Sequence, residues 1–374
     1  MKITVSKVEL FNKLRSIGKI IPSKSSLPAY DNFLFNVNES GKLFITAGDE
    51  GGRMSIYVDC LTDFSGEMVM VPAKTILDAL KEIPEQPIMF ELEKQKNYFN
   101  IRCEYSGGRF ELLGGLGAEY PTIEMKNEES PIKVFTEDFL YGIRQVQFCA
   151  ADDELRPTIN GIYFDKVGDK VTYVASNGTI LGMVETTLES GTGKSAFIIP
   201  SKYAKILSSI IPADCQEVEI IVDSTNIAFN FDGYSLLCRM IEGRFPNYRA
   251  VIPTKNDKKA TVSKDELLAA LKRVSVFSNR NTSLVAINAA ANEIVLKAQD
   301  IDYSISAEEK LPIDDYQGAP IKIGFNANYL KELLSNIPSE KLVMSFMDPS
   351  RAALLHRCDE DSISLTYLIM PISI

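Results

Sequence analysis

The chain has 374 residues, of which 45% are hydrophobic and 24% are charged, and its formal net charge is −10. This length exceeds what one hydrophobic core usually supports, so two or three domains are expected, and no apolar run is long enough for a transmembrane helix. The negative net charge by itself disfavours nucleic-acid binding, because neutralising phosphates requires Lys and Arg.

The residues on which many enzymes depend are scarce. A single histidine, His356, would have to support any catalytic triad or histidine metal site, so neither is expected. The six cysteines form no CxxC pair, which favours free thiols over disulfides or zinc. No GxxxxGK[ST], GxSxG or GxGxxG run is present. We therefore expect no catalytic residue, no cofactor and no metal.

The first predicted helix begins near Val5. Apolar residues follow it at helical spacing as far as Leu14, and Ser6 before an acid is typical of an N-cap. Residues 42–47 and 52–59 alternate with period two and predict a hairpin. A second amphipathic helix over residues 71–80 stops at Ile83-Pro84, because proline cannot continue a helix.

The same order of elements recurs twice more along the chain. The recurring segments are 134–143 and 262–271 for the first helix, 169–175, 293–298 and 302–307 for the strands, and 199–208 and 325–334 for the second helix. The run G107-G-R-F-E-L also resembles G243-R-F-P-N-Y, without a third copy. The expected fold class is α+β, with three repeats of two helices on antiparallel strands over residues 1–127, 128–253 and 254–374.

The predicted helices are more basic than the rest of the chain. Together they carry a net charge of +6, so the remainder of a chain with a total of −10 carries −16. Lys74 and Lys202 occupy the same position in their repeats. If the helices share one face of the protein, that face is basic while the rest of the protein is acidic. Such a distribution of charge favours sequence-independent contact with a polyanion. The alternative is that these lysines are simply solvated.

The chain ends in the apolar run Y367-L-I-M-P-I-S-I374. Alternation places Leu368, Met370 and Ile372 on one face, as in the wall of a groove. The alternative is an ordinary final core strand, although Pro371 near the terminus favours an edge position.

Several short runs resemble the β sliding clamps, the processivity subunits of bacterial DNA polymerase III. They are M1-K-I-T-V5, S26-L-P28 with Asn32, N160-G161, S176-N-G178, E242-G-R-F-P-N-Y248 and Y367-L-I-M-P371, and with the triple repeat they extend the resemblance over essentially the full length. The resemblance implies a non-enzymatic head-to-tail homodimer. Two three-domain chains would close a six-domain ring around duplex DNA, with helices lining the hole and sheets forming the outer wall.

The resemblance also implies three groups of site residues. The expected DNA contacts are Lys24, Lys74, Arg156, Lys202, Arg249 and Arg280. The expected dimer interface joins Phe110 and Leu112 of one chain to Val276 and Phe277 of the other. The expected apolar pocket consists of Leu155, Ser176, Gly178, Thr179, Leu181, Pro246, Val251, Asn326, Tyr329, Leu368, Met370, Pro371 and Ile372.

The resemblance implies that this pocket takes a short Leu/Phe-containing peptide from the replicative polymerase subunit, the clamp loader, repair polymerases and mismatch-repair proteins. The N-terminal run MKITVSKVEL lacks the apolar region of a signal peptide, so a cytoplasmic, nucleoid-associated location without membrane contact is expected. The chain departs from the family at Thr179, where His is common, and at Asp153, where Gln is often found.

Two other classes of function stay open at this point. The run A150-A-D-D-E-L-R156 could be the carboxylate cluster of a metal-dependent enzyme. Consecutive acids on regular structure point in different directions and no histidine supports them, so a solvated loop is favoured. A scaffold protein that does not bind DNA is the other alternative.

Overall fold

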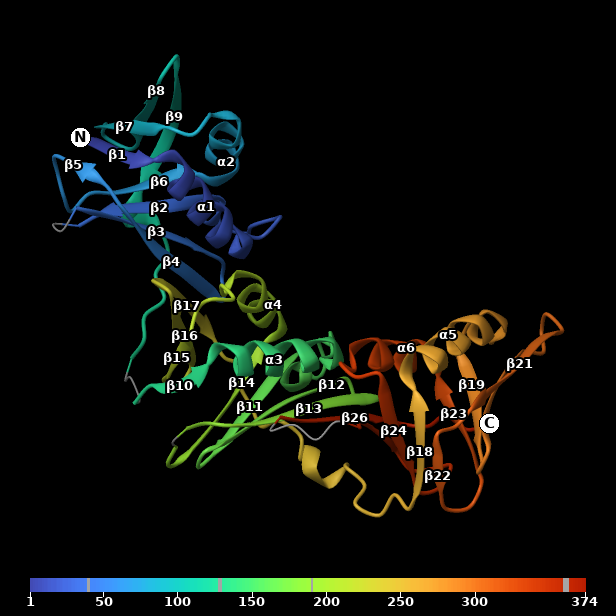
Figure 1. Cartoon of the computed structure of the whole chain (residues 1–374). Coiled ribbons are helices and arrows are strands. Elements are labelled where there is room, and N and C mark those ends of the chain that lie inside the picture. The colour runs from blue at the N-terminus through green and yellow to red at the C-terminus, as the bar shows by residue number, and fades with distance from the viewer. Residues whose placement is uncertain (39–40, 127–129, 190, 359–362) are drawn as a thin grey trace. The chain divides into compact units, whose positions relative to one another are not determined.

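The computed structural model describes residues 1–374 except 39–40, 127–129, 190 and 359–362 (Figure 1). The chain divides into two compact units. Unit 1 comprises Met1–Glu137 with Lys205–Met240, and unit 2 comprises Asp138–Ala204 with Ile241–Ile374. Within the described ranges, no helix is long and apolar enough to cross a membrane.

Six α-helices occupy the segments that the sequence predicts. They are α1 (Lys7–Ile17), α2 (Ala73–Glu82), α3 (Thr136–Val146), α4 (Ser201–Ile210), α5 (Lys264–Val274) and α6 (Ala327–Asn336) among the described residues. Each begins about two residues later than its apolar pattern, because the preceding strand runs directly into the helix. All three second helices end at or before an Ile-Pro pair, as predicted.

The predicted N-caps are confirmed in two repeats and wrong in one. The hydroxyl of Ser6 accepts a hydrogen bond from the backbone N–H of Glu9, and Ser263 caps α5 in the same way through Glu266. Thr136 instead begins α3 itself, and its buried hydroxyl has no hydrogen-bond partner among the described residues. Phe135 therefore stands directly before α3, in the position that Ser6 and Ser263 hold in the other repeats, and it has no side-chain oxygen that could cap the helix.

Unit 1 contains one sheet in which thirteen described strands are antiparallel to their neighbours. In sheet order these are β10 (Ile132–Phe135), β15 (Glu217–Val222), β16 (Asn226–Phe231), β17 (Tyr234–Arg239), β4 (Gly52–Asp59), β3 (Lys42–Gly48), β2 (Asn32–Val37), β6 (Met68–Pro72), β9 (Gly108–Leu116), β8 (Phe99–Tyr105), β7 (Pro87–Lys94), β1 (Lys2–Ser6) and β5 (Leu61–Thr62). Leu10 and Leu14 of α1 and Ile76 and Leu80 of α2 are fully buried against it.

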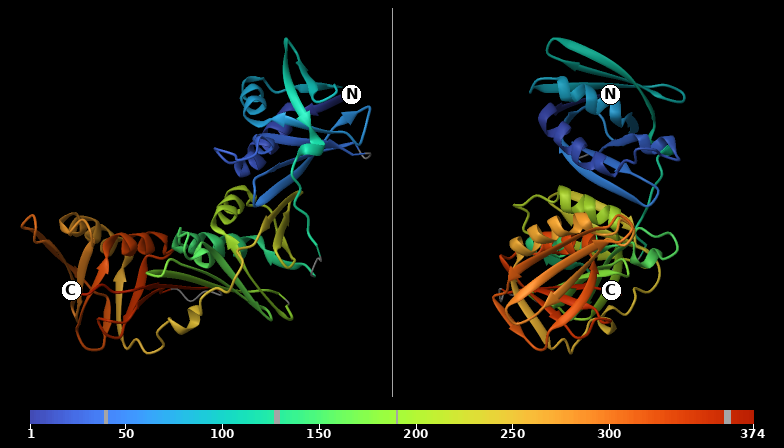
Figure 2. Two further views of the ribbon diagram at one scale, coloured as in Figure 1. Left: turned by 180° about the vertical axis from the view of Figure 1, so that it is seen from behind. Right: turned by 90° about the vertical axis from the view of Figure 1, so that its right-hand side faces the viewer.

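Unit 2 contains two antiparallel sheets in its described part. The nine-stranded sheet runs β14 (Lys194–Pro200), β11 (Gly161–Val167), β12 (Lys170–Ser176), β13 (Ile180–Thr187), β26 (Ser364–Ile369), β25 (Ala353–Arg357), β24 (Lys341–Phe346), β18 (Lys258–Ser263), β22 (Asp315–Gln317). The four-stranded sheet runs β21 (Ile305–Pro312), β20 (Glu293–Asp300), β19 (Leu284–Ala289), β23 (Ile321–Asn326). In this unit α3, α5 and α6 lie on one side of the strands (Figure 2).

One predicted strand of unit 2 is corrected. We expected the partner of residues 293–298 to begin at Asp302, but β21 begins at Ile305. Residues 301–304 form the hairpin turn, and Ser304 adopts a positive φ of 54° that a strand does not allow.

The order of a strand, a helix, a three-stranded meander, a strand, a helix and another meander occurs three times, which confirms the predicted repeat and the α+β class. The last strand of one repeat pairs with the first meander of the repeat before it, and we call this pairing a seam. The first seam joins β4 to β17 within unit 1, and the second joins β13 to β26 within unit 2.

At or just beyond the end of its last strand, each repeat is closed by pairing with the strand that precedes its second helix. Met70 pairs with Gly115 in the first repeat, and the N–H of Ile241 donates to the carbonyl of Ile198 in the second. In the third repeat Ile372 donates to Gly324 at 2.8 Å. The end of the chain is therefore the closing segment of the third repeat.

The partial repeat inferred from two similar runs is wrong. The run G107–L112 lies in the β8–β9 hairpin and in β9, whereas G243–Y248 follows β17 and ends in a 3-10 turn, Tyr248–Ala250. The topological counterpart of Phe245-Pro246 is Tyr120-Pro121, which follows β9 in the same way.

Candidate functional site

Unit 2 has a cavity of about 560 Å³ between the ends of β13 and β26 and the segments 155–159 and 245–251. The structure brings nine of the predicted pocket residues to its lining: Leu155, Ser176, Gly178, Thr179, Leu181, Pro246, Val251, Leu368 and Met370. Sequence reasoning missed Ile159, Phe245 and Tyr248, which also line it. The run E242–Y248 was the available signal, but nothing local shows which of its side chains turn inward.

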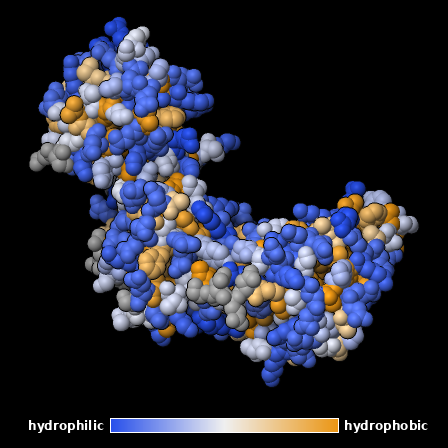
Figure 3. Space-filling model, in the orientation of Figure 1, coloured by the Kyte–Doolittle hydropathy of each residue, from blue (hydrophilic) through white to orange (hydrophobic). Residues whose placement is uncertain are grey.

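The cavity has a packed floor and an exposed apolar rim. Leu181 and Leu368 lie directly opposite each other across the second seam, and each is only 3% exposed. The rim side chains Leu155, Val251 and Met370 are 91%, 54% and 40% exposed. The face of unit 2 seen in Figure 3 is largely hydrophilic with separate hydrophobic patches. Exposed apolar groups around a hollow are typical of a binding site.

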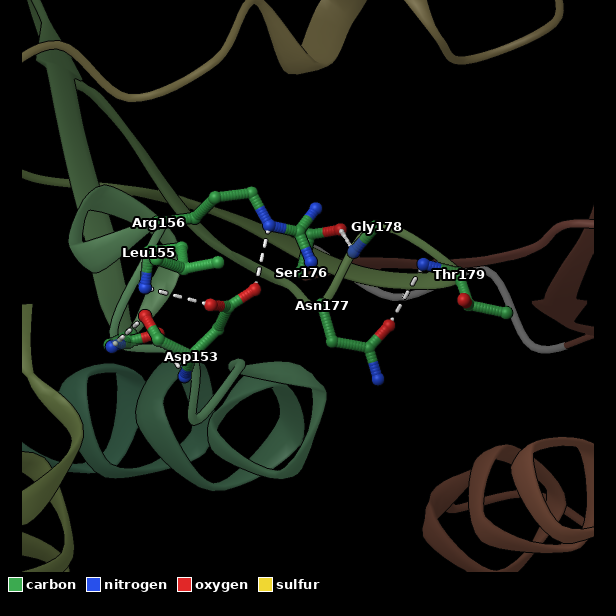
Figure 4. A network of polar contacts seen from close by, with 8 residues as sticks. Asp153, Leu155, Arg156, Ser176, Asn177, Gly178 and Thr179 are labelled. Carbon is green, nitrogen blue, oxygen red and sulfur yellow. Dashed lines mark hydrogen bonds and ion pairs between the residues drawn. The ribbon is translucent and has the colours of Figure 1, made fainter.

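A network around Asp153 holds one side of the cavity (Figure 4). Its carboxylate accepts hydrogen bonds from Arg156 Nε at 2.8 Å and from the N–H of Leu155 at 2.9 Å. The hydrogen bond from Arg156 is the largest of the effects that lower the pKa of Asp153. Asn160 Nδ2 donates to the backbone carbonyl of Asp153 at 2.9 Å. This network fixes the loop that presents Leu155 to solvent.

A tight turn forms the edge of the cavity next to Arg156 (Figure 4). Ser176 Oγ accepts from the N–H of Gly178 at 3.1 Å and donates to the carbonyl of Ile180 at 2.7 Å. Gly178 has φ of +88°, and a Cβ there would lie 3.2 Å from a guanidinium nitrogen of Arg156. A glycine is therefore favoured both by the backbone conformation and by the neighbouring side chain.

Four predicted pocket residues lie outside the lining of this cavity, and their contact with a peptide stays a prediction. Asn326 is the N-cap of α6, where its Oδ1 accepts from the N–H groups of Asn328 and Tyr329. Tyr329 lies in α6 itself. Pro371 follows the end of β26, and Ile372 pairs with Gly324 in the closing segment. The expected alternation thus ends at Met370, because the chain leaves the strand after Ile369.

The alternative interpretation of the terminal run is confirmed for its first part. β26 lies between β13 and β25 in the nine-stranded sheet, so residues 364–369 form a central core strand. The same strand then contributes Leu368 and, just beyond its end, Met370 to the cavity. The run therefore has both of the roles that the sequence left open.

The six predicted DNA contacts are all exposed, but they do not share one environment. Lys74 and Lys202 are each the second residue of their helix, as the repeat predicts. Arg156 is ion-paired to Asp153 beside the cavity. Arg249 lies 3.8 Å from Asp165 and 3.9 Å from Glu185. Lys24 and Arg280 follow the first helices of repeats one and three.

Arg249 lies in a different environment from the other members of this group, and its contact with DNA stays a prediction. Phe164 and Tyr173 pack against each other and Tyr173 packs on Phe139 of α3, so these side chains define the helix face of β11 and β12. Asp165 follows Phe164 on β11 and points to the opposite face. The ion pair with Asp165 therefore places Arg249 on the face away from α3, not beside the helices.

The predicted interface residues lie at strand and helix ends in different units. Phe110 and Leu112 are half-buried on β9 of unit 1. Val276 and Phe277 lie in a 3-10 turn, Ser275–Phe277, after α5 of unit 2 and are 73% and 38% exposed.

The remaining chemistry is sparse. Cys60, Cys103, Cys149, Cys215 and Cys238 are free thiols. Burial raises the pKa of Cys149 well above its ordinary value and lowers that of His356, which keeps both groups neutral. Apart from the residues left undescribed, no group of three His, Cys, Asp or Glu residues is arranged to hold a metal ion, and Asp153 is instead used by the loop described above.

Comparison with known proteins gives three consecutive matches along the chain. The N-terminal, central and C-terminal domains of the DNA polymerase III beta subunit match residues 1–124, 133–247 and 249–373. The chain belongs to the β sliding clamp family. The family is non-catalytic, and membership makes this chain a clamp of DNA polymerase III that confers processivity, with DNA and a polymerase as its classes of partner.

Individual relatives are similar to this chain over its whole length. The β sliding clamp of Vibrio cholerae is 26% identical over 372 residues, covering 100% of both chains, and that of Escherichia coli K12 is 25% identical over 99% of each. The crystal structure of the β subunit from Streptococcus pyogenes matches with a TM-score of 0.93 at 21% identity over 100% of both chains. The three predicted domains are confirmed in number, while their boundaries stay predictions.

Proposed function

We propose that two copies of this chain close head to tail into a ring around duplex DNA, and that the cavity of unit 2 docks short apolar peptides of replication and repair proteins. The observation that carries this proposal is that the three equivalent repeats differ in which of their strand edges are paired. Among the described residues, two seams are made within the chain, and the strands that would make a third have open edges.

The open edges belong to β21 and β9. β21 is the counterpart of β4 and β13 in the third repeat, and it is an edge strand of the four-stranded sheet. β9 is the counterpart of β17 and β26 in the first repeat, and it pairs with β6 only at Gly115 and Leu116. Exposed strand edges tend to pair with strands of another chain. Pairing β21 of one copy with β9 of a second copy covers both edges, and it occurs twice in a closed dimer.

The existing seams also predict the register of the third. In the second seam Leu181 lies opposite Leu368. The hairpin registers of the three repeats make Ser306 of β21 the counterpart of Leu181, and Glu111 of β9 the counterpart of Leu368. With these two residues opposite each other, Glu308 of one copy faces Arg109 of its partner. A cross-strand pair of opposite charge supports this register.

The apolar side of the same seam has a parallel within the chain. Phe148, in the 3-10 turn after α3, packs on Tyr367 of β26 with ring centroids 5.6 Å apart. Their counterparts in the proposed third seam are Val276 and Phe110. The exposed Val276 and the half-buried Phe110 would then cover each other between copies, as the family resemblance implies.

The DNA contacts of the proposed ring are phosphate contacts from the helix side. Lys24, Lys74, Lys202 and Arg280 are exposed near the helices, and their charges oppose the acidic remainder of the chain. Contacts of this kind position the protein without reading bases, and they weaken as salt increases. A closed ring needs little affinity because topology retains it on DNA.

The cavity is proposed to take a Leu/Phe-containing peptide. Its floor is apolar, its volume of about 560 Å³ suits a few side chains, and Arg156 is the only charged residue among the described residues that line it. Such motifs would be carried by the replicative polymerase, the clamp loader, repair polymerases and mismatch-repair proteins, in the cytoplasm near the nucleoid. Met370 at the rim gives a wall that adapts to several sequences.

The deciding experiment measures mass and retention together. Sedimentation should give a particle of twice the chain mass of 41.6 kDa. After loading by a clamp loader, the protein should stay on nicked circular DNA at high salt and leave the same DNA once it is linearised. Equal retention on both forms would reject the ring, and a monomer that binds neither would favour the scaffold alternative.

A further inference from the structure

We infer that Asp165 and Arg249, which do not line the cavity, hold Tyr248 in place, and thereby set how tightly the cavity binds its peptide. This inference rests on the proposed peptide-docking function. It gives Arg249, expected from the family resemblance to contact DNA, a different role as a positioning residue.

Tyr248 connects the cavity to the sheet behind it. Its ring lines the cavity, and its residue is only 6% exposed. Its hydroxyl donates a hydrogen bond of 2.7 Å to Asp165 Oδ2 on β11. Tyr163 and Phe245 stack at a centroid distance of 4.9 Å beside it. The segment 245–251 contributes much of one wall, so the hydroxyl bond anchors that wall to a rigid strand.

Arg249 completes the anchor from outside. Its guanidinium lies 5.0 Å from the centroid of the Tyr248 ring, and its terminal nitrogens lie 3.8 Å from Asp165 and 3.9 Å from Glu185. A further nitrogen contact of 3.5 Å reaches Thr172 Oγ1 on β12. The side chain thus spans β11, β12 and β13 while covering the tyrosine from the solvent side.

The charges around the hydroxyl favour its role as a donor. Burial is the main cause that raises the pKa of Tyr248, and the hydrogen bond to Asp165 raises it further, while Arg249 lowers it. The hydroxyl therefore stays protonated and donates to a carboxylate, which is a stronger bond than one between neutral groups. Arg249 balances the carboxylates of Asp165 and Glu185 beside the partly buried ring.

The same geometry argues against a DNA contact for Arg249. The residue lies on the strand face away from α3, and two carboxylates stand within 4 Å of its guanidinium. A phosphate approaching that face would meet both carboxylates as well as the arginine. The charge of Arg249 is paired with carboxylates of the same chain, so we expect this side chain to stabilise the cavity wall and not to bind DNA.

The test compares peptide binding in four variants: Tyr248→Phe, Asp165→Ala, Asp165→Asn and Arg249→Gln. A fluorescein-labelled synthetic peptide with adjacent Leu and Phe is titrated by anisotropy. Tyr248→Phe and Asp165→Ala should each weaken binding about fivefold, because a charge-assisted bond is lost while the ring remains. A fifth protein that combines Tyr248→Phe with Asp165→Ala should bind the peptide no more weakly than either single variant, since both substitutions remove the same interaction. Asp165→Asn keeps an acceptor and should recover most of the affinity.

Matched controls separate this role from general stability. Tyr316→Phe removes another hydroxyl of unit 2, which donates to the carbonyl of Ala319, and Arg351→Gln removes another ion-paired arginine. Both should leave peptide binding unchanged. Arg249→Gln should weaken peptide binding about threefold and leave retention on circular DNA at its original level. Loss of DNA retention with normal peptide binding would overturn the inference.

Hydrogen exchange without peptide distinguishes this inference from the proposed function. In Asp165→Ala the amides of residues 245–251 should exchange faster, while those of residues 176–180 on the far edge keep their rate. If the unmodified protein binds no such peptide, the docking proposal fails, but the exchange rates still show whether Asp165 holds residues 245–251 in place. If Asp165→Ala changes neither the exchange rates nor the peptide affinity, the hydrogen bond from Tyr248 to Asp165 does not hold the cavity wall in place.

Discussion

At the scale of single residues, Gly178 shows how a turn and a side chain can depend on each other. Its φ of +88° is costly for other residues, and a Cβ there would make a tight contact of 3.2 Å with a guanidinium nitrogen of Arg156. The sequence run S176-N-G178 indicated a turn, and the turn is there. The contact with Arg156 could not be predicted, because the two residues come from different loops.

Gly178→Ala should therefore affect the cavity as well as stability. We expect a loss of about 1–2 kcal/mol in the free energy of unfolding from the left-handed backbone, together with weaker peptide binding as Arg156 is displaced. Gly193→Ala is the matched control, because Gly193 has φ of +75° in the same unit but no atom of the described residues within 4 Å of its Cβ position. If both variants bind peptide equally, the contact with Arg156 has no part in docking.

Asp223 supports a prediction about pH. Burial raises its pKa, but hydrogen bonds from the N–H groups of Thr225, Lys126 and Asn226 at 2.6–2.8 Å outweigh burial and bring the pKa down to about 2. The folded value lies below the unfolded value of about 3.9, so the stabilisation is complete above about pH 5 and is lost as pH falls from about 4 toward 2.

Asp223→Asn should consequently cost about 2 kcal/mol in unfolding free energy at neutral pH. The difference from the unmodified chain should stay constant down to about pH 5 and narrow below about pH 4, as measured by urea unfolding at a series of pH values. A difference that widens as pH falls would mean that the carboxylate is not stabilised in its ionised form.

At the scale of elements, helices and strands were largely predictable and the cavity only in part. Period and Ile-Pro stops locate all six helices, because these signals are local. The pairing of Ile372 with Gly324 depends on β23, which precedes it by almost fifty residues, so alternation alone did not predict this contact. The position of Arg249 likewise depends on Asp165 and Glu185, which no local pattern connects to it.

The closing segment predicts how truncation acts. Deleting Met370–Ile374 removes a cavity wall and the hydrogen bond from Ile372 to Gly324, but leaves β26 whole. We expect a folded protein with a lower melting temperature that no longer binds the peptide. Deleting only Ser373 and Ile374 keeps Met370 bonded to Thr179 and Ile372 bonded to Gly324, so it should bind normally. Unfolding of the longer truncation would show that the closing segment is essential to the core.

At the scale of the whole molecule, the proposed third seam can be tested by charge. Arg109→Glu should place a carboxylate opposite Glu308 of the partner and shift the protein toward monomers in sedimentation. Adding Glu308→Arg restores opposite charges in both seams of the dimer, so the double variant should recover dimers. A double variant that stays monomeric, or an Arg109→Glu variant that stays dimeric, would refute the register.

The seams described above differ in one respect that has a mechanical consequence for the proposed ring. Two seams in each chain join strands that are tethered by the polypeptide, so after a local opening they re-form at an effective concentration of the order of millimolar. The seam between copies has no such tether, and its re-formation depends on the concentration of free chains. Dilution of the protein, or a clamp loader that pulls on the ring, therefore breaks a seam between the two copies long before it breaks a seam within one chain.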